Sequence, residues 1–223
     1  MTRLFLLLGL VGFLASCNTI DSDEVKPEEI YQSYMYEFDA QLNKTKAHAA
    51  FQIGSNTGKY IQLTEPASIR VNEKDYDEYN NFGMYHYHFR FNSKQDATFV
   101  FTDNDGKSFS NTIEKESLNG IGFEGEISYE KGMDLFINFS GLPVQDRESV
   151  YVYLWNELTN ATHYQTTEGE TSIIIPASKL RDFDGSMVNI TLHREIKYSL
   201  ENTTTAGGEL EFLFSSAKKQ IQM

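Results

Sequence analysis

The sequence predicts an all-β protein in which two tandem β-sandwiches follow an N-terminal signal segment and a short flexible tether. From Tyr31 onward apolar and polar residues alternate with period two, as in strands that bury one face. Convincing helical periodicity is absent from the same region. The strand-like segments fall into two blocks of about seven, separated by a Gly-containing break at residues 114–122.

The N-terminus has the form of a secretory signal. Arg3 gives a positive start, and an apolar run extends from Leu4 to Leu14. A membrane-spanning helix needs roughly 20 apolar residues, so this run is too short to span and is typical of a signal-peptide core. We therefore predict that residues 1–16 are a signal peptide.

The end of that run, Leu14-Ala15-Ser16-Cys17, resembles the lipobox of bacterial lipoproteins. The resemblance implies cleavage before Cys17 and lipidation of its thiol, with an expected location in the cell envelope, on the outer membrane in particular. Cys17 is the only cysteine in the chain, which excludes internal disulfides, cysteine nucleophiles and cysteine metal sites. A plain signal peptide with a chance cysteine is the alternative interpretation.

Residues 17–29 are mostly polar and lack periodicity, which predicts a flexible lipidated tether. The acidic cluster Asp21-Ser22-Asp23-Glu24 resembles the export signal of surface lipoproteins in Bacteroidota. A merely solvated linker explains it equally well. The sequence therefore leaves open whether the protein faces the periplasm or the cell surface.

The first sandwich is predicted over residues 30–116. Its clearest feature is a hairpin whose turn is Asp103-Asn104-Asp105-Gly106, between two strands of alternating pattern. The expected strands are Tyr34–Leu42, Ala47–Ile53, Lys59–Leu63, Ser68–Asn72, Met84–Asn92, Thr98–Thr102 and Lys107–Ile113.

The second sandwich is predicted over residues 121–217. Its expected strands are Phe123–Tyr129, Met133–Phe139, Ser149–Asn156, His163–Thr167, Ser172–Ile175, Met187–His193 and Glu209–Phe214. Two blocks of this length and strand spacing are typical of immunoglobulin-like sandwiches.

Three segments of the second block resemble a fibronectin type III domain. Residues 135–143 look like its second strand and turn, Ile173-Ile174-Ile175-Pro176 like its fifth strand, and residues 188–192 like its sixth. Phe139 stands where that family usually has Trp, and the usual Tyr of the sixth strand is missing. The whole chain is similar to Bacteroidota lipoproteins that combine a lipobox, an acidic tether and two sandwiches.

Two motifs with metal-ligand character have simpler explanations. His86 and His88 share one strand face, but His48, His163 and His193 are distant in sequence and supply no recognisable third ligand. The sequence therefore predicts Tyr85, Tyr87, Phe89 and Phe91 in the core and the histidines in water. The 103–106 segment has part of a calcium-loop pattern, but a hairpin turn explains it better. We expect no metal and no cofactor.

No catalytic motif is present, and the carboxylate pairs Glu124/Glu126 and Asp182/Asp184 lie beside turns. The sequence therefore predicts a protein that is not an enzyme and has no catalytic residues. The formal net charge of -13 repels nucleic acid, so we expect no nucleic-acid partner.

One strand carries a candidate ligand surface. In residues 150–155, Val150, Val152 and Leu154 alternate with aromatic residues, and we expect the aliphatic face in the core. The other face would then present Tyr151, Tyr153 and Trp155, which we call the aromatic stripe. It would stack on sugar rings, pack on another protein, or form cross-strand pairs only. The reverse orientation, with the aromatic side chains in the core, stays open.

These observations predict a membrane-anchored, non-enzymatic envelope lipoprotein that serves as a protein-contact, assembly or display module. The alternative is a glycan-binding surface lipoprotein that serves a sugar-uptake system. The sequence distinguishes these functions only through the surface beside the aromatic stripe. A sugar platform needs two or three exposed rings beside polar groups, whereas a protein contact would be larger and more aliphatic.

Overall fold

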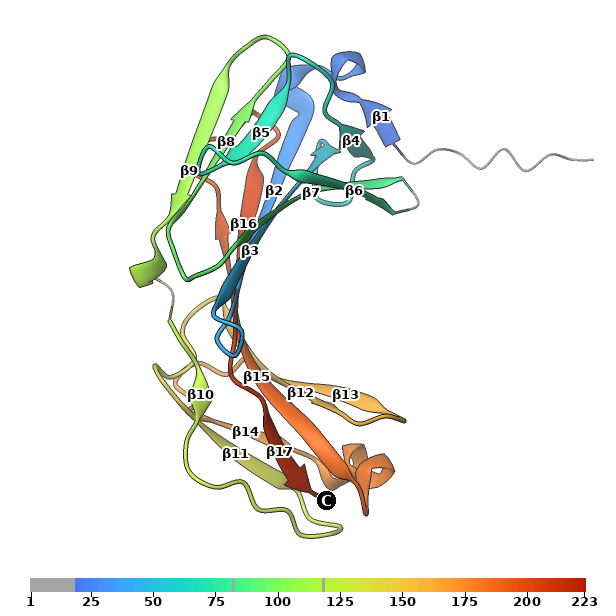
Figure 1. The fold of residues 1–223 in the computed structure, drawn as a ribbon, viewed down its shortest axis with the longest axis vertical. Helices are drawn as coiled ribbons and strands as arrows, with labels where there is room; N and C mark the ends of the chain where they lie inside the picture. Colours follow the sequence, from blue (N-terminus) through green and yellow to red (C-terminus); the bar gives the residue numbers. More distant parts are fainter. Residues whose placement is uncertain (1–18, 82, 118) are drawn as a thin grey trace, which may run out of the picture.

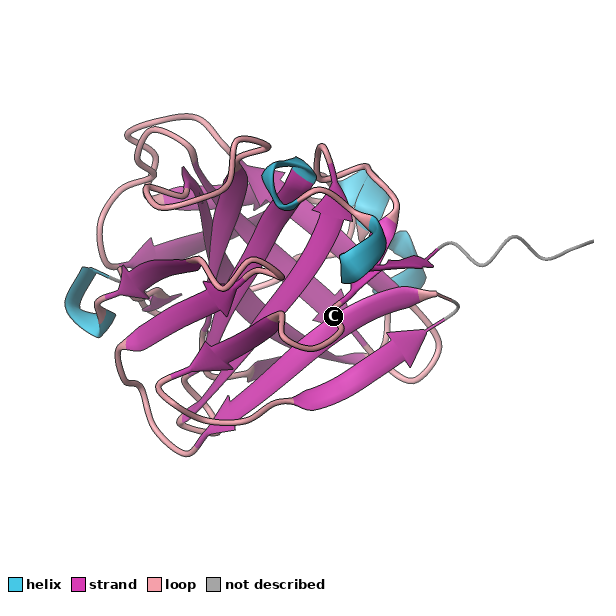
Figure 2. Ribbon diagram, turned by 90° about the horizontal axis from the view of Figure 1, so that it is seen from above, coloured by secondary structure: helices cyan, strands magenta, loops and turns pink. Residues whose placement is uncertain are grey.

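The computed structural model describes residues 19–223 except residues 82 and 118. The signal segment and Cys17 lie outside the described residues. Strands make up most of the described chain and are joined by loops and short 3-10 turns (Figure 2). Within the described part, no helix is long and apolar enough to cross a membrane. The predicted all-β sandwich class is confirmed.

The strands follow the predicted alternation, and in β2 (Ile30–Asp39), β8 (Ala97–Thr102) and β12 (Glu148–Trp155) buried residues alternate with partly buried ones. In the first half they are β1 (Thr19–Asp21), β2 (Ile30–Asp39), β3 (Lys44–Ile53), β4 (Tyr60–Gln62), β5 (Ser68–Val71), β6 (Asp77–Asn81), β7 (Met84–Phe91), β8 (Ala97–Thr102) and β9 (Ser108–Ile113). In the second half they are β10 (Gly122–Phe123), β11 (Leu135–Ser140), β12 (Glu148–Trp155), β13 (Asn160–Gln165), β14 (Ser172–Ile175), β15 (Met187–Ser199), β16 (Gly208–Ser215) and β17 (Lys219–Gln222).

The molecule is a crescent built on one continuous 11-stranded sheet (Figure 1). The path β1-β4-β3-β2-β16-β15-β12-β13 crosses both halves of the chain, and β6, β7 and β17 extend it. Two three-stranded sheets, β5-β8-β9 and β10-β11-β14, cover its convex side in the upper and lower arms. The outer face of the continuous sheet therefore lines the concave side of the crescent.

The two sandwiches share strands from the C-terminal part of the chain. β15 is 13 residues long; its N-terminal part pairs with β12 and β17, and its C-terminal part pairs with β16. β16 in turn pairs in parallel with β2, from Gly208 opposite Gln32 to Ser215 opposite Asp39. The expected boundaries at 30–116 and 121–217 stay a prediction. The structure adds that residues 208–215 complete the sheet of the first sandwich.

The core of the first sandwich contains side chains from both ends of the chain. Tyr36 of β2 packs on Phe212 of β16 with ring centroids 5.6 Å apart, and Phe38 packs on Phe214 at 5.3 Å. Tyr34 stacks on Phe99 of the opposite sheet at 4.6 Å. Each such buried aromatic side chain contributes about 1.5–3 kcal/mol to stability.

The second sandwich has the layer arrangement of an immunoglobulin-like domain. The sheet β10-β11-β14 packs on the lower part of the continuous sheet. The core includes Leu135, Ile137, Phe139, Ile173 and Ile175 from one layer and Val150, Val152, Leu154, Val188, Ile190 and Leu192 from the other. The three segments that resemble a fibronectin type III domain form β11, β14 and the first part of β15.

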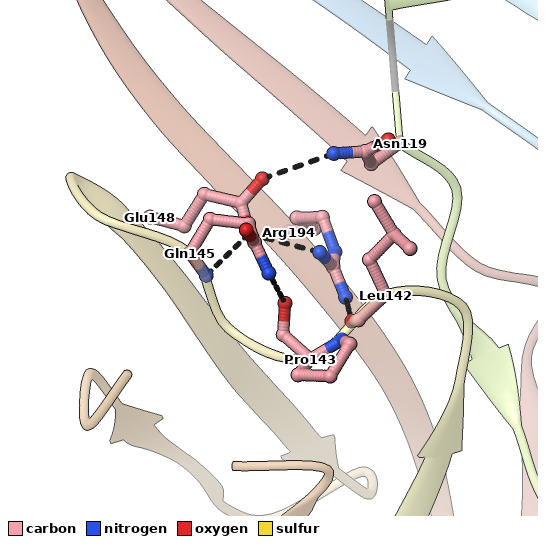
Figure 3. A network of polar contacts seen from close by, with 6 residues as sticks. All are labelled: Asn119, Leu142, Pro143, Gln145, Glu148 and Arg194. Carbon is pink, nitrogen blue, oxygen red and sulfur yellow. Dashed lines mark hydrogen bonds and ion pairs between the residues drawn. The ribbon is translucent and has the colours of Figure 1, made fainter. Parts of the chain in front are cut away.

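A buried polar network lies where β15 crosses between the sandwiches (Figure 3). Arg194 of β15 forms an ion pair with Glu148 of β12, with Nη1 and Oε2 separated by 2.9 Å, and it also donates to the Leu142 carbonyl. The Gln145 backbone N–H donates to Glu148 Oε2 at 3.0 Å, and Asn119 of the inter-block segment donates to Oε1 at 3.4 Å. The network thus ties the connection between the halves to the shared sheet.

Close backbone contact at the same junction requires glycine. Gly141 has φ +102°, and a Cβ built there would lie 2.5 Å from the Gly120 carbonyl oxygen. Any side chain at residue 141 would therefore push the turn after β11 away from the inter-block segment.

Residues 19–29 differ from the expected flexible tether. Thr19, Ile20 and Asp21 form β1, paired in parallel with β4. Ser22 is fully buried, and its Oγ accepts a hydrogen bond from the Thr64 backbone N–H. The Glu29 carbonyl accepts from the Gly54 N–H at 2.7 Å. This segment is therefore part of the first sandwich, because its backbone groups find partners there despite its polar sequence.

Other differences are local. The expected strand Phe123–Tyr129 is reduced to Gly122–Phe123, and β1, β6 and β17 were not expected. The predicted hairpin between β8 and β9 is confirmed. The Asp103 carboxylate accepts from the backbone N–H groups of Asp105 and Lys107, so the turn itself uses the side chain that the calcium interpretation would need.

Candidate functional site on the concave sheet face

The aromatic stripe lies on the concave face of the continuous sheet. Val150, Val152 and Leu154 are 0% exposed in the second core, so the alternate side chains of β12 point to the opposite face. Tyr151, Tyr153 and Trp155 are half-buried there. The expected orientation is confirmed, whereas their role in binding stays a prediction.

Ring contacts hold the stripe in place. Tyr153 and Trp155 stack at 5.1 Å between centroids, with 20° between their planes. Tyr151 stacks on His193 of β15 at 4.5 Å and also contacts Tyr164 of β13 at 4.9 Å. Sequence reasoning missed His193 and Tyr164, because alternation shows which face a residue occupies but not its neighbour on the next strand.

Polar side chains flank the Tyr153–Trp155 pair. The register places Tyr153 between Thr162 and Thr191, and Trp155 between Asn160 and Asn189. Asn189 Oδ1 accepts from Gln220 of β17 at 2.9 Å. Asn189 Nδ2 donates to the Trp155 carbonyl at 3.4 Å, so this amide already has partners, and Thr191 is buried. The exposed polar groups beside the stripe are those of Asn160 and Thr162.

Burial keeps Tyr151 and His193 uncharged at neutral pH. Burial, followed by the nearby Glu195 carboxylate, raises the pKa of Tyr151. Burial lowers the pKa of His193 to about 4, and its Nδ1 lies 2.9 Å from Ser215 Oγ.

The middle of the concave face is charged but internally paired. Lys46 Nζ lies 3.4 Å from Glu37 Oε2, and Lys197 Nζ lies 3.5 Å from Glu195 and 3.1 Å from Glu211. Such exposed pairs contribute little to stability, typically about 0–1 kcal/mol. They separate the aromatic stripe from a second aromatic cluster in the upper arm.

The side chains of that second cluster line a hollow of about 350 Å³, which we call the histidine hollow. His48 of β3 is the register partner of His88 of β7, and their ring centroids are 4.4 Å apart. The residues around it are Ser33, Tyr34, Met35, His48, Ala49, Ala50, Gln52, Tyr60, Tyr79, His86 and His88. The sequence had not linked His48 to the pair His86 and His88; strand pairing brings them together.

The absence of a metal from the histidine hollow stays a prediction. Over the described ranges, no group of three or more His, Cys, Asp or Glu side chains is placed to hold a metal ion. Tyr87 and Phe89 are in the core as expected, and Tyr85 and Phe91 are partly buried. The histidines are partly buried rather than fully in water. His88 Nε2 is buried and has no hydrogen-bond partner among the described residues.

The carboxylate pairs are not arranged for acid–base chemistry. Glu124 and Glu126 are exposed, and Asp182 is exposed as well. Asp184 accepts a hydrogen bond from Tyr129 and lies 3.2 Å from Lys131 Nζ, and these contacts lower the pKa of Asp184. A carboxyl group with a lowered pKa stays ionised and is poorly suited to act as a general acid.

No family model matches the chain, and no curated protein matches it significantly. Among solved structures, the chicken interferon gamma receptor alpha chain is similar, with 10% identity, 84% of this chain and 95% of that chain covered, and a TM-score of 0.30. The FN1–FN3 domains of chicken CNTN1 are similar over 79% of this chain and 63% of that chain, with 9% identity and a TM-score of 0.23. At these TM-scores, neither likeness supports a functional inference.

The histidines of the concave face should make stability depend on pH. Burial lowers the pKa of His48 and that of His193 to about 4, below the ordinary value of 6.5. The folded state therefore binds fewer protons than the unfolded state in this range. The stabilisation that comes from folding with both histidines neutral is complete above pH 6.5 and is lost as the pH falls toward 4. We expect the melting temperature to fall between pH 7 and pH 5.5, before most carboxylates titrate.

The double variant His48→Gln/His193→Gln tests this origin. Its melting temperature should change less between pH 7 and pH 5.5 than that of the parent, as measured by circular dichroism. An equal change in both proteins would show that other groups cause the pH dependence.

Proposed function

We propose that the protein is a lipid-anchored, non-enzymatic binding module of a bacterial cell envelope, held in the outer membrane through Cys17, and that it contacts another envelope protein. The observation that carries the binding proposal is the concave sheet face. One hydrogen-bonded sheet spans both sandwiches and presents half-buried aromatic side chains at each end. Aromatic side chains held in place by a sheet lose little conformational freedom on binding and often dominate contact energies.

Supporting arguments for the anchor come from the sequence. The lipobox ends at Cys17, and no other cysteine is available for a competing role. Support for a non-enzymatic role comes from the carboxylates, since Glu148 is paired with Arg194 and Asp184 with Tyr129 and Lys131. These groups already have structural partners.

The anchor is tested by Cys17→Ala. Labelled fatty acid should no longer be incorporated, and the protein should remain uncleaved or appear in the soluble fraction. A variant that still labels and partitions like the parent would rule out lipidation at Cys17.

A glycan ligand is the second candidate, and one observation favours it. The stacked Tyr153–Trp155 pair is flanked by the exposed side chains of Thr162 and Asn160, which matches a sugar platform of ring faces beside hydrogen-bonding groups. In this case the protein would deliver sugars to an uptake system of the same envelope.

One variant, Trp155→Ala, tests both candidate ligands, and two binding assays separate them. Trp155→Ala should reduce ligand binding at least tenfold, since aromatic contacts of this kind contribute about 2 kcal/mol or more. Pull-down from envelope extracts reports a protein partner, and a glycan array reports a sugar. Phe136→Ala is the matched control, because Phe136 is 61% exposed on β11 of the opposite sheet. Equal binding by both variants would remove the aromatic stripe from the site.

A further inference from the structure

The β6–β7 hairpin lies beside the point where the described chain begins. Thr19 Oγ1 donates a hydrogen bond to the Gly83 carbonyl in the hairpin turn. Figure 1 shows β1, β6 and β7 on the same side of the molecule. Thr19 is two residues after Cys17, a separation of at most about 7 Å along an extended chain. With the proposed lipid anchor at Cys17, this turn is held close to the headgroups.

The hairpin has the composition of a membrane-interface segment. Residues 79–89, at the turn end of the hairpin, contain no Asp, Glu, Lys or Arg, although the chain has a net charge of -13. The exposed charged residues Asp77, Glu78 and Arg90 lie at the other end of the hairpin. Tyr79 is 53% exposed and Met84 is 36% exposed. Tyrosine prefers the boundary between headgroups and water, where its ring is in an apolar environment and its hydroxyl is hydrated. The uncharged turn end also avoids the repulsion that the acidic remainder would experience near anionic lipids.

We propose that the β6–β7 hairpin seats on the phospholipid surface beside the anchor, with Tyr79 and Met84 in the headgroup layer. This inference rests on the lipid anchor of the proposed function and adds a second contact to it. The anchor supplies a high effective concentration, so a weak apolar contact is enough to hold the hairpin down. Two contacts fix the orientation of the first sandwich, and the shared sheet passes that orientation to the aromatic stripe.

Site-specific labelling of the acylated protein tests the proposal. Acylation consumes the Cys17 thiol, so Met84→Cys introduces a unique reactive thiol. The variant is labelled with a fluorophore and reconstituted in phosphatidylcholine vesicles that contain a headgroup-level nitroxide lipid. Phe136→Cys, in the other sandwich on the convex side, is the matched control. We expect quenching several-fold stronger for the residue 84 label than for the residue 136 label.

The outcomes separate this proposal from the anchor itself. Mass spectrometry of the same samples shows whether Cys17 carries fatty acid, and circular dichroism shows whether each labelled variant is folded. Equal quenching at both positions in an acylated, folded protein would overturn the hairpin contact and leave the anchor intact. If envelope extract shields the residue 84 label and nitroxide lipid does not quench it, the hairpin contacts a protein partner. That outcome would also overturn the proposed lipid contact.

As a second measurement, Tyr79→Ser in the acylated Met84→Cys protein should weaken the quenching of the residue 84 label, because one of the proposed lipid contacts is lost. Tyr79 is 53% exposed, so the fold should tolerate its replacement. Quenching that Tyr79→Ser leaves unchanged would contradict the proposal.

Discussion

A fragment of residues 19–118 should fail to fold, although it contains every strand predicted for the first sandwich. Removing β16 leaves β2 without its parallel partner from Gln32 to Asp39. It also uncovers Tyr36 and Phe38, which pack on Phe212 and Phe214. At about 1.5–3 kcal/mol for each exposed aromatic side chain, the loss is a large share of a typical stability of about 5–15 kcal/mol. Circular dichroism should show no cooperative melting transition.

A nicked full-length protein is the control for this fragment. A protease site inserted at the inter-block segment near Asn119 should be cut without separating the halves, because β2–β16 pairing and Arg194–Glu148 contacts remain. The halves should co-elute in gel filtration and separate only in denaturant. A fragment 19–118 that melts cooperatively on its own would show that the two sandwiches are independent units.

Replacing Arg194 by methionine should destabilise the protein by about 3–5 kcal/mol, because Glu148 is left as an unpaired charge in a buried site. The Leu142 carbonyl also loses its donor. The substitution should also weaken the junction between the two halves, since the Glu148 carboxylate accepts a hydrogen bond from Asn119 of the inter-block segment. Urea denaturation measures the change in the free energy of unfolding.

The double variant Arg194→Met/Glu148→Leu distinguishes a lost ion pair from a general packing defect. Removing both charges eliminates the unpaired carboxylate, so the double variant should recover much of the stability that Arg194→Met loses. The stability lost by Glu148→Leu alone is measured as well. If the losses of the two single variants simply add in the double variant, the ion pair is not what stabilises the crossing point.

Much of the strand architecture was predictable because strand formation leaves a local signal. Alternation at period two placed Val150, Val152 and Leu154 on one face of β12 and the aromatic stripe on the other, and the structure shows that the aliphatic face is in the core. The Asp103–Gly106 turn was predictable for a similar reason, since the turn residues and their hydrogen bonds lie within a few positions. Arg194 also left a signal: it shares the core-facing phase of Val188, Ile190 and Leu192, where an arginine needs a buried partner.

The sequence by itself determined the all-β class and which side chains of β12 share a face. Only the tertiary structure decided that β16 pairs with β2, that His48 lies beside His88, and that residues 19–29 join the first sandwich. The physical reason is the range of the interactions. Alternation follows from each strand's own geometry, whereas the partner of a strand depends on hydrogen bonds and packing between residues far apart, such as Gly208 and Gln32, which leave no local pattern.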